Sequence, residues 1–238
     1  IESQSSDFVI DLASGQGQDL KKYIDCDFEK ILMIENDMDA INEIINRKYT
    51  YMKNTDKMPV IHVQHANLTN SCKTLLKNIQ TNGIDISKKA SFIACNLAIH
   101  YLIPTKRKIQ NFCNILDNLL NNQGIFTFTA FDSKKIIKLL ANTKVWEKRD
   151  PITKQIVYSI KKKYTDSVVN KKIEVLLPFS NNKYYTESVI DIDLLNECLE
   201  KKKIILINHG SFIDVEEQFK KQKLHFYDQL TDIDREYI

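Results

Sequence analysis

Residues 9–19 read VIDLASGQGQD. A short apolar run stops at Asp11, a turn of small residues follows, and a helical pattern begins directly behind the turn. The turn holds two of the five glycines in the chain, and glycine lets a backbone bend tightly while a ligand approaches closely. About one strand later, the run 31–34 ends at a second acid, Glu35. This order predicts one half of a nucleotide-type site, in which the second carboxylate binds a ribose diol.

The turn favours S-adenosylmethionine over NAD or FAD as the ligand. A dinucleotide-binding loop has the pattern Gly-x-Gly-x-x-Gly, and its third glycine packs the helix against the strand under a pyrophosphate. Asp19 and Leu20 stand there instead. A carboxylate near the helix start repels pyrophosphate but can face the ammonium group of a methionine moiety. A nucleotide-dependent dehydrogenase is therefore disfavoured, and an ordinary strand-to-helix turn without a ligand is the structural alternative.

Composition places few further limits on function. The 238 residues carry a formal net charge of +3, which gives no overall signal for a polyanion partner, although lysines cluster in short runs. The five cysteines are odd in number and widely spaced, so we interpret them as reduced core residues and expect neither disulfides nor a metal site. Because no apolar stretch is long enough to span a bilayer, we expect no membrane partner.

Apolar runs and helical repeats alternate along the first part of the chain. Five runs fit strands separated by amphipathic helices: 8–12, 30–35, 60–63, 91–96 and 125–130. We expect Asn36 or Asp37 to cap the second helix and Gly124 to end the helix before the fifth strand. Strict alternation of strand and helix predicts a Rossmann-like α/β fold with a doubly wound, mostly parallel sheet.

The pattern changes after Trp146. Two runs, 156–164 and 172–177, predict antiparallel strands joined by a polar turn, and an apolar run at 203–208 predicts a sixth strand behind a further helix. We expect one domain over residues 1–238. Its predicted parts are a cofactor-binding core at 1–145, an antiparallel insertion near the site at 146–190, and a C-terminal helix and strands at 191–238 from which the last strand is missing.

Polar side chains follow the third and fourth expected strands, where ligands bind in sheets of this kind. Asn67 can reach an adenine amino group, and the neighbouring backbone at Leu68 can serve the same base. His100 can donate to a carbonyl oxygen, and Tyr101 can pack on a base. A satisfied histidine at a helix start is the alternative interpretation of His100.

Several segments resemble one family. Residues 95–101, CNLAIHY, are similar to the Cys/Ser-Gln-Phe-x-x-His-Tyr segment of mRNA cap guanine-N7 methyltransferases. Residues 11–20 resemble the Asp-Leu-Gly-Cys-Gly-Lys-Gly-Gly-Asp-Leu run of that family, and residues 35–41 resemble a stretch of the poxvirus capping enzyme. Residues 185–189, followed by 194–197, resemble its late glutamate segment before a Leu-Asn-Glu helix. The matches run in order over nearly the whole chain.

The resemblance implies a class I methyltransferase fold and assigns roles to individual residues. The implied cofactor-binding residues are Asp11, Ala13, Gly15, Gly17, Asp19, Glu35, Asn36, Asn67, Leu68, Asn96 and Tyr101. The implied residues around the cap are His100, Tyr101 and Glu187 for the guanine, and Lys22 and Arg47 near the phosphates. Three positions depart from the family pattern: Ala13 replaces a glycine, Gln16 a lysine and Asn67 an aspartate.

The resemblance further implies an mRNA (guanine-N7)-methyltransferase of a large DNA virus. S-adenosylmethionine would be the methyl donor and S-adenosylhomocysteine the product, with no metal and no catalytic side chain, because alignment of the reactants suffices. The implied partners are the capped mRNA 5′ end and other capping domains on the same polypeptide, and the implied location is cytoplasmic. Two alternatives stay open: another class I methyltransferase acting on a small molecule or protein, and a non-catalytic subunit that binds RNA.

Overall fold

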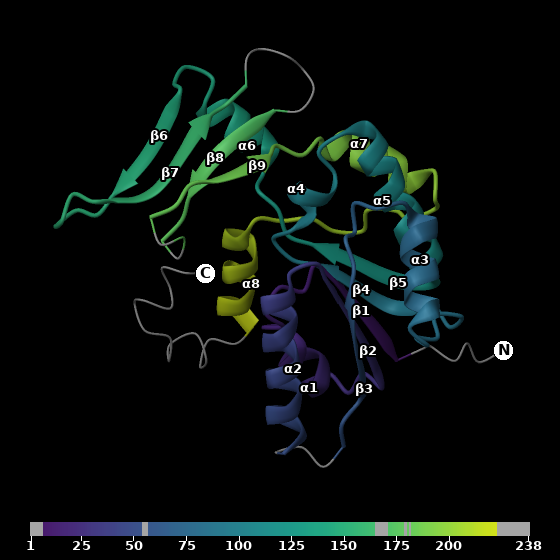
Figure 1. Ribbon diagram of the computed structural model, residues 1–238. Helices are drawn as coiled ribbons and strands as arrows, with labels where there is room; N and C mark the ends of the chain where they lie inside the picture. The colour runs from purple at the N-terminus through teal and green to yellow at the C-terminus, as the bar shows by residue number, and fades with distance from the viewer. Residues whose placement is uncertain (1–6, 54–56, 165–170, 179, 181, 223–238) are drawn as a thin grey trace. The chain divides into compact units, whose positions relative to one another are not determined.

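The computed structural model describes residues 7–53, 57–164, 171–178, 180 and 182–222. The chain divides into two compact units, residues 1–203 and residues 204–238. The first unit contains two sheets and most of the helices (Figure 1). Among the described residues, no helix combines the length and the apolar character needed to cross a bilayer.

A five-stranded parallel sheet forms the centre of the first unit (Figure 1). Its strands are β1 (Phe8–Leu12), β2 (Lys30–Glu35), β3 (Val60–His65), β4 (Ala90–Cys95) and β5 (Leu120–Phe128). The strand order is β3-β2-β1-β4-β5, and every neighbouring pair is parallel. This order confirms the predicted doubly wound sheet. The winding direction reverses between β1 and β4, which places a ligand crevice at the carboxyl ends of these two strands.

Helices cover both faces of this sheet. On one face lie α1 (Leu20–Asp25) and α2 (Met38–Met52), and on the other lie α3 (Cys72–Thr81) and α5 (Lys106–Leu119), as Figure 1 shows. All residues of β1 are buried, as expected for a strand covered on both sides. Asp37 caps α2, because its side chain accepts hydrogen bonds from the backbone N–H groups of Asp39 and Ala40.

Gly124 has a different role from the predicted one. Helix α5 ends at Leu119, and β5 begins at the next residue, so Gly124 lies inside the strand. The register between β4 and β5 is irregular here, and a Cβ atom at Gly124 would lie 2.9 Å from the carbonyl oxygen of Ala90. The prediction that Gly124 ends the helix was wrong, because this glycine permits close contact between two strands.

An antiparallel sheet follows the parallel one. Its strands β6 (Val145–Arg149), β7 (Ile156–Lys162), β8 (Lys172–Leu176) and β9 (Tyr185–Ser188) are neighbours in that order. The inner strands β7 and β8 confirm the predicted antiparallel pair, and the outer strands β6 and β9 were not predicted.

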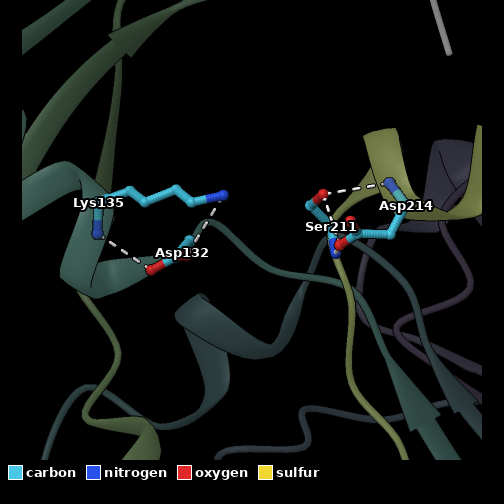
Figure 2. Close-up of polar contacts among 4 residues, drawn as sticks. All are labelled: Asp132, Lys135, Ser211 and Asp214. Carbon is cyan, nitrogen blue, oxygen red and sulfur yellow. Dashed lines mark hydrogen bonds and ion pairs between the residues drawn. The ribbon is translucent and has the colours of Figure 1, made fainter.

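Helix α6 (Ser133–Leu139) packs on one face of the antiparallel sheet. Ile136 and Leu140 form a buried cluster with the sheet residues Ile160 and Val175. Asp132 caps this helix: its Oδ1 accepts a 3.0 Å hydrogen bond from the backbone N of Lys135, and its Oδ2 lies 3.9 Å from Nζ of Lys135 (Figure 2). The cap fixes the point at which the chain leaves β5 and turns toward the second sheet.

Helix α7 (Ile192–Glu200) packs on α5 and is the last described helix or strand of the first unit. In the second unit, residues 204–210 belong to no strand, so the strand predicted at 203–208 was wrong. An apolar run forms a strand only where a neighbouring strand satisfies its backbone groups. Helix α8 (Phe212–Gln222) follows, and its first turn is held by reciprocal hydrogen bonds between Ser211 and Asp214 (Figure 2). The expectation that the last strand is missing from residues 191–238 stays a prediction, because residues 223–238 lie outside the described residues.

Candidate active site

The loop between β1 and α1 bends through residues with left-handed backbone conformations. Ala13, Gly15 and Gly17 have φ values of 57°, 51° and 72°. A Cβ atom at Gly15 would meet nothing within 4 Å, so the loop faces open space there. A Cβ atom at Gly17 would lie 3.0 Å from Cγ1 of Ile44 on α2. Gly15 therefore leaves room for a ligand, and Gly17 lets the loop pack closely on the helix.

Glu35, at the end of β2, holds its carboxylate against this loop. Its Oε2 accepts a 2.7 Å hydrogen bond from the backbone N of Gly15. Its Oε1 accepts hydrogen bonds from the backbone N atoms of Asn36 and Asp37 at 2.7 and 3.0 Å. These three donors fix the carboxylate at the ligand edge of the sheet, and Oε2 retains a lone pair that can accept from a ribose hydroxyl.

A second carboxylate, that of Asp19, joins the start of α1 to the end of β4. Asn96 donates a 2.9 Å hydrogen bond from Nδ2 to Oδ2 of Asp19, and Lys22 donates from Nζ to Oδ1 at 2.6 Å. Burial raises the pKa of Asp19, but the hydrogen bonds from Lys22 and Asn96 outweigh burial and hold that pKa below its usual value. Asp19 therefore stays ionised and can face a cationic group.

Asp11 lies in β1 and is only 3% exposed. Burial and the negative charge of Asp19 raise the pKa of Asp11 to about 7, against the opposing effect of the Tyr23 hydroxyl. Burial also raises the pKa of Tyr23, so the phenol keeps its proton. Asp11 is thus a buried acid whose ionisation depends on the pH near neutrality, directly before the loop that carries Gly15.

The end of β3 contributes a turn and a buried amide. Asn67 accepts a 2.8 Å hydrogen bond at Oδ1 from the backbone N of Thr69, so part of its amide already holds the local turn. Leu68 is buried beside it. The buried amide is that of Gln64, which is 2% exposed. It accepts a 2.9 Å hydrogen bond from Asn82 and donates from Nε2 to the backbone O of His65 at 2.8 Å, so it is already bonded within the fold.

The second half of the site joins the short helix α4 (Ile99–Leu102) to β9. His100 and Tyr101 lie on α4 with ring centroids 4.0 Å apart, and Glu187 lies on β9. The hydroxyl of Tyr101 donates to Oε1 of Glu187 at 3.4 Å, and Nε2 of His100 lies 3.5 Å from Oε2 of Glu187. The fold therefore brings together the three residues predicted to surround the guanine.

Polar atoms of this cluster are buried without a hydrogen-bond partner in the described part of the chain: His100 Nδ1, His100 Nε2 and Glu187 Oε2. Burial lowers the pKa of His100 to about 4, so its imidazole is neutral at neutral pH. Burial raises the pKa of Glu187, against the hydrogen bond from Tyr101. Because an unsatisfied buried polar group costs about 1–3 kcal/mol, such a cluster is typical of a site that a polar ligand completes.

An aromatic wall beside His100 was not predicted as part of the site. A small cavity next to His100 is lined by Phe131, by Ser133 at the start of α6 and by Ser188 of β9. The ring centroid of Phe131 lies 6.5 Å from that of His100. The available signal was the position of Phe131 behind the fifth expected strand, where side chains face the ligand edge.

The two predicted phosphate contacts are not joined to this cluster. Lys22 is bound to Asp19, and Arg47 lies in the third turn of α2 with its Nε atom buried and unpartnered among the described residues. Their roles stay predictions. Across the same residues, no group of three or more His, Cys, Asp or Glu side chains is arranged to hold a metal ion.

Sequence comparisons relate this chain to viral capping enzymes. A family model described as "mRNA (guanine-N(7))-methyltransferase domain" matches residues 2–235. The mRNA-capping enzyme of African swine fever virus (isolate Pig/Kenya/KEN-50/1950) is 29% identical over 239 residues, covering 96% of this chain and 27% of that protein. A protein of Acanthamoeba polyphaga mimivirus named "Probable mRNA-capping enzyme" is 24% identical over 220 residues, covering 86% of this chain and 17% of that protein. The chain thus spans about a quarter or less of these relatives.

Structural comparisons show the fold. An S-adenosylmethionine-dependent methyltransferase from Clostridium acetobutylicum has a TM-score of 0.53 at 16% identity, covering 82% of this chain and 72% of that one. The CcbJ methyltransferase from Streptomyces caelestis has a TM-score of 0.54 at 10% identity, covering 82% and 71%. At such identities the likeness confirms the class I methyltransferase fold and carries nothing about the substrate.

Proposed function

The chain belongs to the mRNA (guanine-N7)-methyltransferase family, and from this premise we propose that it transfers a methyl group from S-adenosylmethionine to N7 of the guanine in a GpppN cap. The observation that carries the proposal is the pair of buried side chains His100 and Glu187, joined by the hydroxyl of Tyr101, in which both ring nitrogens of His100 and Oε2 of Glu187 have no hydrogen-bond partner among the described residues. It lies beyond β4, one of the two strands that flank the ligand crevice.

The residues around the first loop fit S-adenosylmethionine. Glu35 is fixed by backbone donors with a lone pair left for the ribose, and the position of Gly15 is open. Asp19 stays ionised and suits the ammonium group of the methionine moiety. When bound, S-adenosylmethionine supplies an activated methyl group on a sulfonium. The pattern lacks the third glycine that a pyrophosphate needs, which supports this cofactor over a dinucleotide.

The second cluster fits guanine. Guanine presents N1–H and N2–H as adjacent donors, and the Glu187 carboxylate can accept from both. His100 is neutral, so one ring nitrogen carries a proton and can donate to O6. Tyr101 holds one oxygen of Glu187 and places an aromatic ring beside the base. Adenine offers the opposite donor pattern on this edge and would leave Glu187 unpaired.

The protein's task in this reaction is alignment. N7 of guanine carries an exposed lone pair and needs no general base, so the residues need only hold the base edge and exclude water. Glu187, His100 and Phe131 do this from β9, α4 and the end of β5, three elements that meet at one edge of the fold. We therefore assign no nucleophile, no acid and no metal to the chemical step.

The relatives extend the proposal to the setting of the reaction. Because this chain spans 27% of the African swine fever virus capping enzyme, we propose that other capping domains share its polypeptide. The capped 5′ end of mRNA is the proposed partner. The cytoplasmic location expected from the resemblance stays a prediction.

The test is transfer of labelled methyl groups from S-adenosylmethionine to GpppA and GpppG by this chain, with uncapped RNA as the control. Label at guanine N7, located by digestion and chromatography, would support the proposal. Cofactor binding without transfer to either cap would contradict guanine as the acceptor and favour another methyltransferase. Absence of cofactor binding would favour the non-catalytic alternative. Gln16 and Asn67, which depart from the residue pattern of the family, support that alternative.

A further inference from the structure

Positive charge is concentrated at one end of the antiparallel sheet. Within residues 161–172, five lysines accompany one acid, Asp166; the lysines are Lys161, Lys162, Lys163, Lys171 and Lys172. The chain has a net charge of +3, so without these five lysines it would carry a net charge of 3 − 5 = −2. We call these five residues the lysine end of the sheet. It lies where β7 ends and β8 begins.

The strand register connects the lysine end to the proposed guanine site. Lys162 of β7 pairs with Ile173 of β8, and Ile173 pairs with Glu187 of β9. Residues paired in this way share one face of a sheet, and neighbouring strands lie about 4.8 Å apart, so the backbones of Lys162 and Glu187 are about 10 Å apart. Side chains alternate along a strand, so Lys161 and Lys172 lie on the opposite face from Lys162 and Glu187, and the lysines surround the end of the sheet on both faces. A chain of phosphates leaving a guanine held by Glu187 passes this end of the sheet.

Tyrosine rings accompany the lysines. Nζ of Lys161 lies 3.6 Å from the ring centroid of Tyr184, and Nζ of Lys171 lies 5.5 Å from that of Tyr164. Lys163 forms an ion pair with Glu174. Within the described residues, no carboxylate lies at ion-pair distance from Lys171 or from the exposed Lys172. The lysine end therefore keeps uncompensated charge next to flat aromatic rings, the combination that single-stranded nucleic acid favours.

We propose that the lysine end binds the phosphates of the RNA that follows the cap guanine. This inference rests on the proposed function, because it needs the guanine to be held at Glu187. The alignment of Lys162 with Glu187 favours RNA over an anionic membrane surface, since a membrane needs no such register. The surface then makes the enzyme prefer a capped RNA chain over a free cap dinucleotide.

The test compares two substrates, GpppG and a capped unstructured RNA of roughly 20 nucleotides, longer than ordinary single-strand binding sites. The test variant is Lys171→Gln/Lys172→Gln. The matched control is Lys73→Gln/Lys77→Gln, which removes the same charge from exposed positions on α3. Initial rates give KM and kcat for each substrate at several salt concentrations.

Counterion release sets the expected size. Each phosphate contact on a single strand contributes about −0.7 to the slope of log affinity against log salt concentration, so affinity falls by a factor of about five for each tenfold rise in salt. The loss of two contacts should therefore raise KM for the capped RNA about 25-fold at about 0.1 M salt. It should also reduce the slope of log KM against log salt concentration by about 1.4. We expect kcat, KM for GpppG and the control variant to stay at wild-type values.

Several results would overturn the inference. These are an equal rise in KM for GpppG, an equal effect of the Lys73→Gln/Lys77→Gln control, or no wild-type preference for the longer substrate. Loss of binding to phosphatidylserine vesicles with unchanged use of RNA would assign the lysine end to a membrane instead. Fluorescence anisotropy with uncapped 5′-triphosphate RNA separates the two proposals. If methyl transfer fails but this binding still depends on Lys171 and Lys172, only the proposed reaction falls.

Discussion

Replacing Glu187 with glutamine tests the guanine site directly. One carboxylate oxygen of Glu187 accepts the Tyr101 hydroxyl, and the other is buried without a hydrogen-bond partner among the described residues. In Glu187→Gln, one oxygen becomes an NH₂ group, which sets a donor against a donor of guanine. Losing one hydrogen bond to a charged group costs about 1.5–3 kcal/mol, so kcat/KM for GpppG should fall about 10- to 150-fold.

The same substitution should not destabilise the protein. Burial raises the pKa of Glu187, which means that the fold disfavours the ionised carboxylate. Glutamine has nearly the same shape and no charge, so the midpoint of thermal unfolding at pH 8 should stay level or rise. Activity and stability therefore change independently, which a purely structural role of Glu187 does not allow.

Initial rates of methyl transfer to GpppG and thermal unfolding are measured on the same preparations. Glu174→Gln is the matched control, because Glu174 lies on the neighbouring strand β8 and pairs with the exposed Lys163 at 2.9 Å. Such a surface pair contributes only about 0–1 kcal/mol, so Glu174→Gln should keep wild-type kcat/KM. Wild-type activity in Glu187→Gln, or equal losses in both variants, would refute the assignment of Glu187 to guanine.

Three further predictions concern the first loop. The folded pKa of Asp11 is about 7 against 3.8 in the unfolded chain, so its stabilising contribution is complete below pH 3.8 and is lost as the pH rises through 7. The free energy of unfolding, measured in urea, should therefore fall by about 3 kcal/mol between pH 5 and pH 8 in the wild-type protein. The Asp11→Asn variant should lack most of that fall. A variant whose free energy of unfolding falls as much as that of the wild type would contradict the assignment to Asp11. Glu35→Ala should weaken binding of S-adenosylhomocysteine about 10- to 150-fold in calorimetric titration, whereas Glu43→Ala, on the exposed side of α2, should not; equal affinities would exclude the ribose contact. Gly17→Ala should lower the free energy of unfolding by about 2–3 kcal/mol and Gly15→Ala by about 1–2 kcal/mol. Both glycines have positive φ, but only a Cβ atom at Gly17 meets a neighbouring side chain. A larger loss in Gly15→Ala than in Gly17→Ala would refute the packing argument.

The parallel half of the fold could be predicted because its signals are local. The first two strands were expected at 8–12 and 30–35, and β1 and β2 have these bounds. Strands covered on both faces consist of continuous apolar residues, and in the helices between them the apolar residues repeat with a period of 3.6. The type of each element can therefore be predicted from its own sequence. The alternation then restricts the topology to a doubly wound sheet.

The antiparallel half gave weaker signals. Strands β6 and β9 were missed, and both lie at the edges of their sheet with mostly exposed side chains. An edge strand is defined by its neighbour more than by its own apolar pattern. The wrong predictions at Gly124 and at 203–208 have the same origin, because a glycine inside a strand and an apolar run without a partner can be recognised only once the neighbouring strand is known.

The two halves of the candidate site differ in the same way. The contact of Gly15 with Glu35 spans 20 residues within one strand-helix-strand unit, which the sequence pattern already describes. The contact of Tyr101 with Glu187 spans 86 residues and depends on the register of β9 against β8. A slip of one residue would turn Glu187 to the opposite face of the sheet and separate it from Tyr101. On the proposed assignment, recognition of guanine depends on a short edge strand and binding of the methyl donor depends on the central sheet, so substrate specificity can be lost with the cofactor site intact.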